Sequence, residues 1–130
     1  HPPTPTSEDS ARERGEPIKI GAKALLVKGK EGFVLCVIPA DKRLDAKKVK
    51  RIIGKKMRFA SKEELMSVTG LVPGAVPPFG ELMGVDMLVD PALFDEEKMA
   101  FNAGSLVKSI IMKSSEYKRV VKPKEMPLSL

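Results

Sequence analysis

Two apolar runs in the first third of the chain predict a pair of strands. Residues 18–28 end in aliphatic side chains, and residues 33–38 are almost wholly apolar, which is typical of a buried strand. Only a Gly-Lys-Glu-Gly tetrapeptide at 29–32 separates the two runs. A connection this short and this rich in glycine predicts that the strands form a β-hairpin.

Helical spacing replaces the strand pattern further along the chain. Apolar side chains recur every three to four residues over 45–53, with Asp45 placed to cap the start of a helix and Gly54 placed to end it. A second helix is predicted from Ser61, because Glu64 follows three residues later, as in a capping box. Both helices carry their own start signals.

The remaining elements are shorter and alternate irregularly. This order predicts a mixed sheet with helices around it, the α+β class. The elements are a lead-in at 1–6, a helix at 7–15, strands at 57–60, 85–89, 99–102 and 106–112, a turn or short helix at 91–94, a helix at 114–121 and a tail at 122–130.

Composition narrows the class of protein. A chain of 130 residues with 42% apolar side chains suits one compact domain. No apolar run approaches the roughly 18 residues of a membrane helix, and the first residues lack the pattern of a secretory signal. With a single cysteine and a single histidine, a disulfide framework or a Cys/His metal site is not expected. We therefore expect a cytoplasmic protein that holds no metal.

Charge is unevenly distributed along the chain. Residues 41–60 hold nine basic side chains against two acidic ones, whereas residues 61–100 hold two basic against eight acidic. A dense basic block is expected where a protein meets a phosphate-rich partner. A solvated, lysine-rich helix gives the same pattern, and charge does not distinguish the two interpretations.

Most catalytic arrangements are excluded by the residues that are missing. No histidine lies inside the chain, so a Ser-His-Asp or Cys-His arrangement cannot form within it. Phosphate-binding glycine motifs are absent as well. Cys36 lies in the middle of a predicted strand, and we expect a buried structural thiol there.

Three features stand out from the ordinary pattern. Lys23 shares a strand face with Leu25 and Val27, so its ammonium group either reaches the edge of the sheet or projects into a pocket. The apolar loop 70–80 holds three glycines and three prolines, and it forms either a pocket wall or a rigid surface turn. The segment 101–105, Phe-Asn-Ala-Gly-Ser, offers polar contacts at a strand end, or is an ordinary turn.

Taken in order, these segments resemble the YbaK domain. The similar stretches are Gly-Ala-Lys-Ala-Leu-Leu-Val at 21–27, Thr-Gly-Leu-Val-Pro-Gly-Ala-Val-Pro-Pro-Phe-Gly at 69–80, and Phe-Asn-Ala-Gly-Ser at 101–105 with Ser109 and Ile110. This family comprises free-standing aminoacyl-tRNA deacylases and the editing domains of many prolyl-tRNA synthetases. The resemblance implies one domain over 7–121, with a largely antiparallel, barrel-like sheet surrounded by short helices.

The resemblance also implies a reaction and a site. The expected reaction is metal-independent and cofactor-independent hydrolysis of misacylated tRNA, chiefly proline tRNA carrying alanine or cysteine, with water assisted by the substrate's 2′-hydroxyl group. The implied partners are this tRNA and a prolyl-tRNA synthetase or synthetase complex, with no membrane or DNA. The implied catalytic residues are Lys23, Gly104 and Ser105; the substrate-binding residues are Gly74, Pro77, Pro78, Phe79, Asn102 and Ser109; the tRNA-binding residues are Lys47, Lys48, Lys50 and Arg51.

Two alternatives remain open. A catalytically silent YbaK-like module would bind tRNA or a synthetase without hydrolysing an ester, although retention of Lys23 and of the 74–78 loop argues against it. A plain basic RNA-binding domain is disfavoured, because the six aromatic residues are scattered and form no stacking platform on a sheet.

Overall fold

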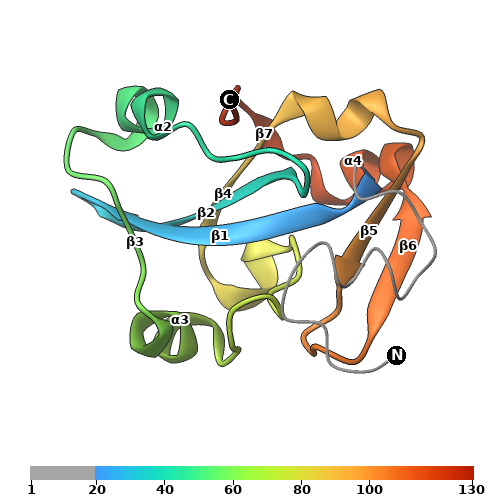
Figure 1. Ribbon diagram of the computed structural model, residues 1–130, viewed down its shortest axis with the longest axis horizontal. Coiled ribbons are helices and arrows are strands. Elements are labelled where there is room, and N and C mark those ends of the chain that lie inside the picture. The colour runs from blue at the N-terminus through green and yellow to red at the C-terminus, as the bar shows by residue number, and fades with distance from the viewer. Residues whose placement is uncertain (1–19) are drawn as a thin grey trace.

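The computed structural model describes residues 20–130 (Figure 1). The expected lead-in at 1–6 and helix at 7–15 lie outside the described residues. The elements in chain order are β1 (Ala22–Gly29), β2 (Gly32–Pro39), α2 (Ala46–Ile53), β3 (Arg58–Phe59), α3 (Lys62–Thr69), the 3₁₀ helix η2 (Gly80–Met83), β4 (Asp86–Val89), the 3₁₀ helix η3 (Pro91–Asp95), β5 (Lys98–Asn102), β6 (Ser109–Lys113), α4 (Ser114–Val121) and β7 (Lys124–Glu125).

The strands form an open mixed sheet and a separate two-stranded ribbon. The sheet has the order β3-β1-β2-β4-β7, and the ribbon pairs β5 with β6. β1 is antiparallel to β2 and β3, whereas β4 is parallel to β2 and β7. The α+β class and the mixed sheet are confirmed.

The expected barrel-like closure is wrong. Two-residue strands, β3 and β7, lie at the two edges of the sheet and do not pair with each other. Within residues 20–130, the backbone pairing between the ribbon and the sheet is the parallel bridge between Gly21 and Ala100. The strands that would have to close a barrel are therefore too short to do so.

The predicted hairpin is confirmed, and its two faces are both covered. Gly29 pairs with Gly32, which leaves a two-residue turn between β1 and β2. On one face Val27 and Cys36 pack with Val49 of α2. On the other face Leu26 packs with Leu65 of α3. Figure 1 shows α2 and α3 on opposite sides of the hairpin.

Cys36 is a core residue, as expected. Its side chain is fully buried, and this burial raises the pKa of the thiol to about 12. A thiol that stays protonated at neutral pH is a poor nucleophile. Cys36 therefore contributes packing and no chemistry.

The predicted helix signals act as the sequence indicates. Asp45 accepts a hydrogen bond from the Lys47 amide at 2.9 Å, and α2 ends at Gly54. Ser61 and Glu64 form the capping box of α3, with both reciprocal hydrogen bonds present. Arg58 of β3 also donates twice to the Glu64 carboxylate, at 2.7 and 2.9 Å, and this pairing lowers the pKa of Glu64 to about 2.

Strand β6 begins three residues later than the sequence predicts. The turn that precedes it is closed by a hydrogen bond from the Ala103 amide to the Lys108 carbonyl at 3.1 Å. Within the turn, the Ser105 hydroxyl group accepts from the Val107 amide at 3.1 Å. These local bonds hold Leu106 and Val107 in the turn, although their side chains favour a strand.

The C-terminal segment is part of the folded core. Lys124 and Glu125 form β7, and the Leu128 side chain is fully buried. The carboxylate of Asp90, 4% exposed, holds this segment: it accepts from the Leu128 amide at 2.9 Å and from the Ser129 amide and hydroxyl group at 2.8 and 2.7 Å. Its other oxygen accepts from the Ala92 amide at 2.8 Å.

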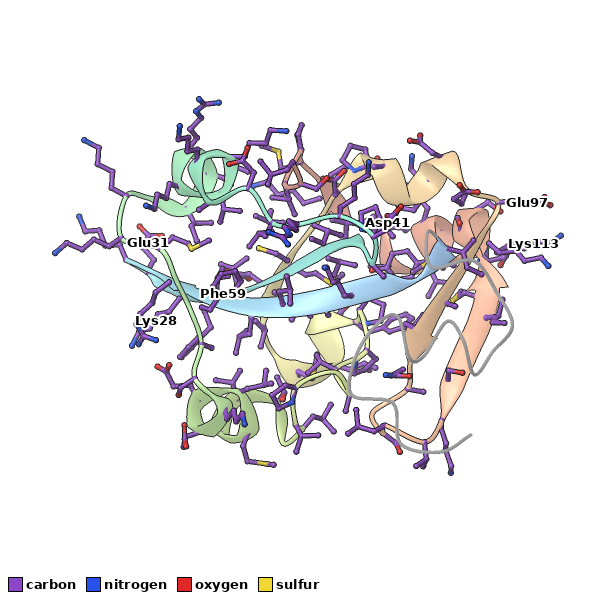
Figure 2. The ribbon with its side chains drawn as sticks, viewed as in Figure 1. Lys28, Glu31, Asp41, Phe59, Glu97 and Lys113 are labelled. Carbon is purple, nitrogen blue, oxygen red and sulfur yellow. The ribbon has the colours of Figure 1, made fainter. Side chains whose placement is uncertain are left out.

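No helix among residues 20–130 is long and apolar enough to cross a membrane. Figure 2 shows Lys28 and Glu31 at the hairpin end of the molecule, and Glu97 and Lys113 at the end that carries β5 and β6. The two ends are therefore distinct surfaces.

The Asp90 contacts predict a stability that depends on pH. Burial on its own would raise the pKa of Asp90, but the four donors outweigh burial and lower it below its usual value. The stability from this group is therefore complete above about pH 4, the pKa of an unfolded aspartate, and is lost as the pH falls through the lower folded pKa. Asp90→Asn turns one acceptor into a donor that faces other donors, so we expect a loss of roughly 2–4 kcal/mol at pH 7.

Thermal unfolding of the wild type and of Asp90→Asn, measured from pH 7 to pH 2, checks this predicted pH dependence. The Glu64 carboxylate, paired with Arg58, also titrates in this acid range, so Glu64→Gln is the control that measures its share of the pH dependence. The melting temperature of Asp90→Asn should be lower at pH 7 and should fall less than that of the wild type on acidification. Parallel curves for the wild type and Asp90→Asn would contradict the assignment.

Candidate functional site

The 70–80 loop is half surface turn and half core. It leaves α3 at Gly70, and its exposed tip is formed by residues 72–74. Ala75, Val76 and Pro78 are then buried, and Val76 packs against Leu26 of β1. The exposed half is therefore a surface turn, one of the two sequence-based alternatives, and the buried half packs into the core; that the loop forms a pocket wall stays a prediction.

Two hydrogen bonds join this loop to the turn after β5. The Asn102 side-chain amide donates to the Gly74 carbonyl at 2.7 Å, and the Gly104 amide donates to the Ala75 carbonyl at 2.9 Å. Gly104 has a φ of +81°, a left-handed conformation that glycine adopts without strain. The structure thus brings together two of the three segments that the sequence singled out.

Aromatic rings pack against the end of the loop that follows this contact. Phe79 lies between Phe101 and Tyr117, with both pairs edge-to-face and ring centroids 5.4 Å apart. The Tyr117 hydroxyl group donates to the Pro78 carbonyl at 2.6 Å. This role of Tyr117 is not predicted from the sequence, where its one signal is a lone tyrosine on the apolar side of a predicted helix.

These contacts bear differently on Gly104 and Ser105, the two implied catalytic residues of this turn. Gly104, one of the implied catalytic residues, already uses its amide to bond the loop. Ser105 is half-buried in the same turn. Ser109, the expected pocket residue on β6, lies opposite Asn102 in the ribbon. Polar side chains therefore surround the loop contact on the ribbon side.

Lys23 lies near the start of β1, half-buried and opposite Ile38. Strand alternation places its side chain on the same side as Leu25, as the sequence predicts, and Leu25 packs in the core under α2, whereas Val76 of the loop packs with Leu26 on the opposite face. The structure therefore does not place the Lys23 side chain on the face where the loop packs. Two residues earlier, Gly21 bridges to Ala100 of β5, so this end of β1 runs beside the strand that leads into the Asn102 turn (Figure 1). The catalytic role of Lys23 stays a prediction.

The basic residues of α2 lie elsewhere. α2 covers the face of the sheet opposite to the one on which Val76 packs. Lys47, Lys50 and Arg51 are exposed, whereas Lys48 donates its ammonium group to the Ser129 carbonyl at 2.7 Å. The predicted tRNA-binding residues therefore divide into three exposed cations and one that also holds the C-terminal segment.

Two grooves flank these surfaces. One, of about 760 Å³, runs between the hairpin turn and the end of α2 and is lined in part by Lys30, Lys50 and Arg51. The other, of about 840 Å³, runs from Phe79 along η2 to the end of α4. Among residues 20–130 no group of three His, Cys, Asp or Glu side chains could hold a metal ion.

Comparison with known proteins identifies the class to which this fold and site belong. The profile of the aminoacyl-tRNA editing domain family matches residues 1–120. The chain therefore belongs to this family, which confirms the resemblance and the enzyme class that it implied, an aminoacyl-tRNA deacylase.

Individual relatives agree with this assignment. The multifunctional Ser/Thr-tRNA deacylase ProXp-y of Escherichia coli K12 is 38% identical over 116 residues, which cover 85% of this chain and 70% of that protein. A proline–tRNA ligase of Thermosipho africanus is 33% identical over 76 residues, 58% of this chain and 14% of the ligase.

A solved structure described as a candidate trans-editing enzyme for prolyl-tRNA synthetase superposes with a TM-score of 0.88 at 24% identity. The match covers 100% of this chain and 83% of that one. A second, of a hypothetical protein, has a TM-score of 0.89 at 27% identity and covers 98% of this chain and 86% of its own. The described elements thus form an editing-domain fold.

Proposed function

We propose that this protein hydrolyses tRNA that carries a small, wrongly attached amino acid, with alanine or cysteine on proline tRNA as its first substrates. The observation that carries the proposal is the contact between the 74–79 loop and the 102–105 turn in a chain of the editing family. Aminoacyl-tRNA is made and used in the cytoplasm, which we propose as the site of action.

Selection by size explains why such an enzyme is needed. A synthetase pocket built for proline cannot strongly reject a smaller amino acid, because one missing methylene group is worth only about 1–3 kcal/mol. A second pocket that admits small side chains and excludes proline removes the error. Stiff residues at the wall of such a pocket serve this purpose, and Pro77, Pro78 and Phe79 supply them here.

The proposed reaction is ester hydrolysis. A water oxygen bonds to the aminoacyl carbonyl carbon, and the bond from that carbon to the ribose oxygen breaks. The ribose oxygen takes up the proton that the water loses. The substrate's 2′-hydroxyl group assists the water. We propose that Lys23 holds the phosphate of the terminal adenosine and that the Ser105 end of the turn faces the carbonyl oxygen as charge develops on it.

Serine and threonine form a second candidate substrate set. The relative that is 38% identical is named a Ser/Thr-tRNA deacylase, whereas the identity to the proline–tRNA ligase is 33% over a shorter stretch. A hydroxylated side chain needs a polar partner in the pocket, and Asn102 and Ser109 lie opposite each other beside the loop. Alanine and cysteine, and serine and threonine, should therefore be tested as substrates in the same assay.

A deacylation panel tests the proposal. Proline tRNA charged with alanine, cysteine, serine or proline, and tRNA mischarged with threonine, are each incubated with the protein and followed by loss of the labelled amino acid. We expect at least one small amino acid to be released well above the rate in buffer and proline to be spared. If no substrate is hydrolysed faster than in buffer, the chain is a silent binding module.

Replacement of Lys23 tests its proposed contact with the terminal adenosine. Lys23→Ala should lower kcat/KM by roughly 100-fold, because a preorganised charge near the reacting ester is lost, while the melting temperature changes little. Lys23→Arg should also fail, since its planar head does not fit a site shaped for an ammonium group.

Lys28→Ala is the matched control for this test. Lys28 is a half-buried lysine of the same strand, and its ammonium group lies 5.3 Å from the centre of the Phe33 ring. The control should keep its activity. Near-normal turnover by folded Lys23→Ala and Lys23→Arg would remove Lys23 from the active site.

The exposed cations of α2 are proposed to contact the tRNA backbone. Replacing Lys47, Lys50 and Arg51 by alanine should weaken tRNA binding and reduce the slope of log K against log salt by up to about three, one per lost phosphate contact. Lys48→Ala should instead lower the melting temperature, because its ammonium group holds the Ser129 carbonyl.

A small substrate separates RNA binding from pocket effects. An aminoacyl-adenosine lacks the acceptor stem, so the triple variant should cleave it at the wild-type rate. Equal losses on aminoacyl-tRNA and aminoacyl-adenosine would show that these residues support the fold or the pocket and do not bind RNA.

A further inference from the structure

Tyr117 is the one tyrosine of the chain, and the interior of the domain encloses it completely. It lies on α4, and its hydroxyl group donates to the Pro78 carbonyl at 2.6 Å, across 39 residues of sequence. The Met87 sulfur lies 3.9 Å from the same oxygen. A buried tyrosine hydroxyl group needs a partner, and here the partner is the backbone of the candidate pocket wall.

The loop has few other ways to be held in place. Pro77 and Pro78 have no amide hydrogen, so this stretch cannot donate hydrogen bonds to a neighbouring strand. The backbone carbonyl groups of the loop can still accept hydrogen bonds. Three of them accept from other parts of the molecule: Gly74 from Asn102, Ala75 from Gly104, and Pro78 from Tyr117.

These three donors hold different ends of the loop. Asn102, at the end of β5, and Gly104, in the turn that follows, bond Gly74 and Ala75 at the start of this stretch, whereas Tyr117 of α4 bonds Pro78 near its end. The Tyr117 ring also packs edge-to-face on Phe79, which follows Pro78 directly. Gly80, the next residue, donates its amide to the Met87 sulfur at 3.3 Å. Tyr117 therefore contacts the wall through both its ring and its hydroxyl group.

We propose that Tyr117 is a positioning residue that fixes the Pro77–Phe79 wall through the Pro78 carbonyl and so sets the size of amino acid that the pocket admits. This inference rests on the proposed function, because it takes the wall to face the aminoacyl group. Burial raises the pKa of the Tyr117 phenol, so the hydroxyl group stays protonated and remains a donor at neutral pH.

Tyr117→Phe removes the donor and keeps the ring. The Pro78 carbonyl is then buried without this partner, and the wall is free to shift to find another. We expect the ratio of kcat/KM for the preferred small amino acid to that for proline to fall roughly tenfold, since a displaced wall loses the size difference it enforces.

Ser114→Ala is the matched control. Ser114 lies three residues earlier on α4, is buried, and donates its hydroxyl group to the Glu96 carbonyl at the same distance, 2.6 Å. This bond does not touch the loop. Both variants should lose stability, but Ser114→Ala should keep the wild-type selectivity. A Tyr117→Phe protein with the same selectivity as Ser114→Ala would overturn the proposal.

A second readout separates this inference from the proposed function. Amide hydrogen exchange at Phe79 and Gly80 reports the order of the wall whether or not the protein hydrolyses anything. We expect exchange there to rise roughly tenfold in Tyr117→Phe and to stay unchanged in Ser114→Ala. Unchanged exchange in Tyr117→Phe would overturn the positioning role even in an active enzyme, whereas an inactive wild type with raised exchange in this variant would count against the proposed function alone.

If Tyr117→Phe does not fold, the wild-type protein still gives an answer. A hydroxyl proton held in a buried 2.6 Å hydrogen bond exchanges slowly with water, so it should be visible by NMR and close to the Pro78 α-hydrogen. A Tyr117 hydroxyl proton that exchanges freely with solvent would contradict the assignment.

Discussion

The structure of the candidate site depends on how the segment Gly74–Phe79 is held. Pro77 and Pro78 have no amide hydrogen, and the amides of Ala75 and Phe79 bond to carbonyl groups within the loop itself, so the hydrogen bonds that join the segment to the rest of the domain come from donors elsewhere that reach its carbonyl groups. Asn102, Gly104 and Tyr117 supply them. The loop is therefore placed by the ribbon and by α4 together, and a shift in either one moves it.

This arrangement places the two proposed functional surfaces on opposite faces of the sheet. The loop and the ribbon turn meet on one side of the sheet, where Val76 packs on Leu26, and α2 with its exposed cations covers the other. A tRNA that contacts both has to pass around an edge of the open sheet. The correction from a closed barrel to an open sheet leaves two edges, β3 and β7, between these faces.

Local patterns explain how much of the fold the sequence predicts. The apolar runs of β1 and β2, the Ser61–Glu64 capping box and the glycine stops act within a few residues, so they are visible in the sequence. The late start of β6 follows from hydrogen bonds within its turn that apolar periodicity does not show. The role of Asp90 was also hidden, because its partners Leu128 and Ser129 lie 38 and 39 residues away.

The site was predictable as segments but not as an assembly. The loop and the turn were singled out by composition and by resemblance, yet nothing in the sequence indicates that Asn102 meets Gly74, 28 residues away. The same limit explains two further outcomes. Gly104, one of the implied catalytic residues, donates its amide to Ala75, and Lys48, expected to bind tRNA, also holds Ser129. Long-range hydrogen bonds of this kind appear only once the chain is folded.

Binding of a stable substrate analogue tests most directly whether the aminoacyl end of the substrate binds between the 74–80 loop and the 101–105 turn. An adenosine that carries alanine through a 3′-amide in place of the ester cannot be hydrolysed, and its titration can be followed by the backbone amide signals of the labelled protein. We predict that the changes in amide chemical shift are concentrated in residues 74–80 and 101–105. Helix α2 should be unaffected by a ligand that lacks the acceptor stem. Shifts confined to α2 and the hairpin turn, with the loop and the ribbon turn unchanged, would contradict this prediction.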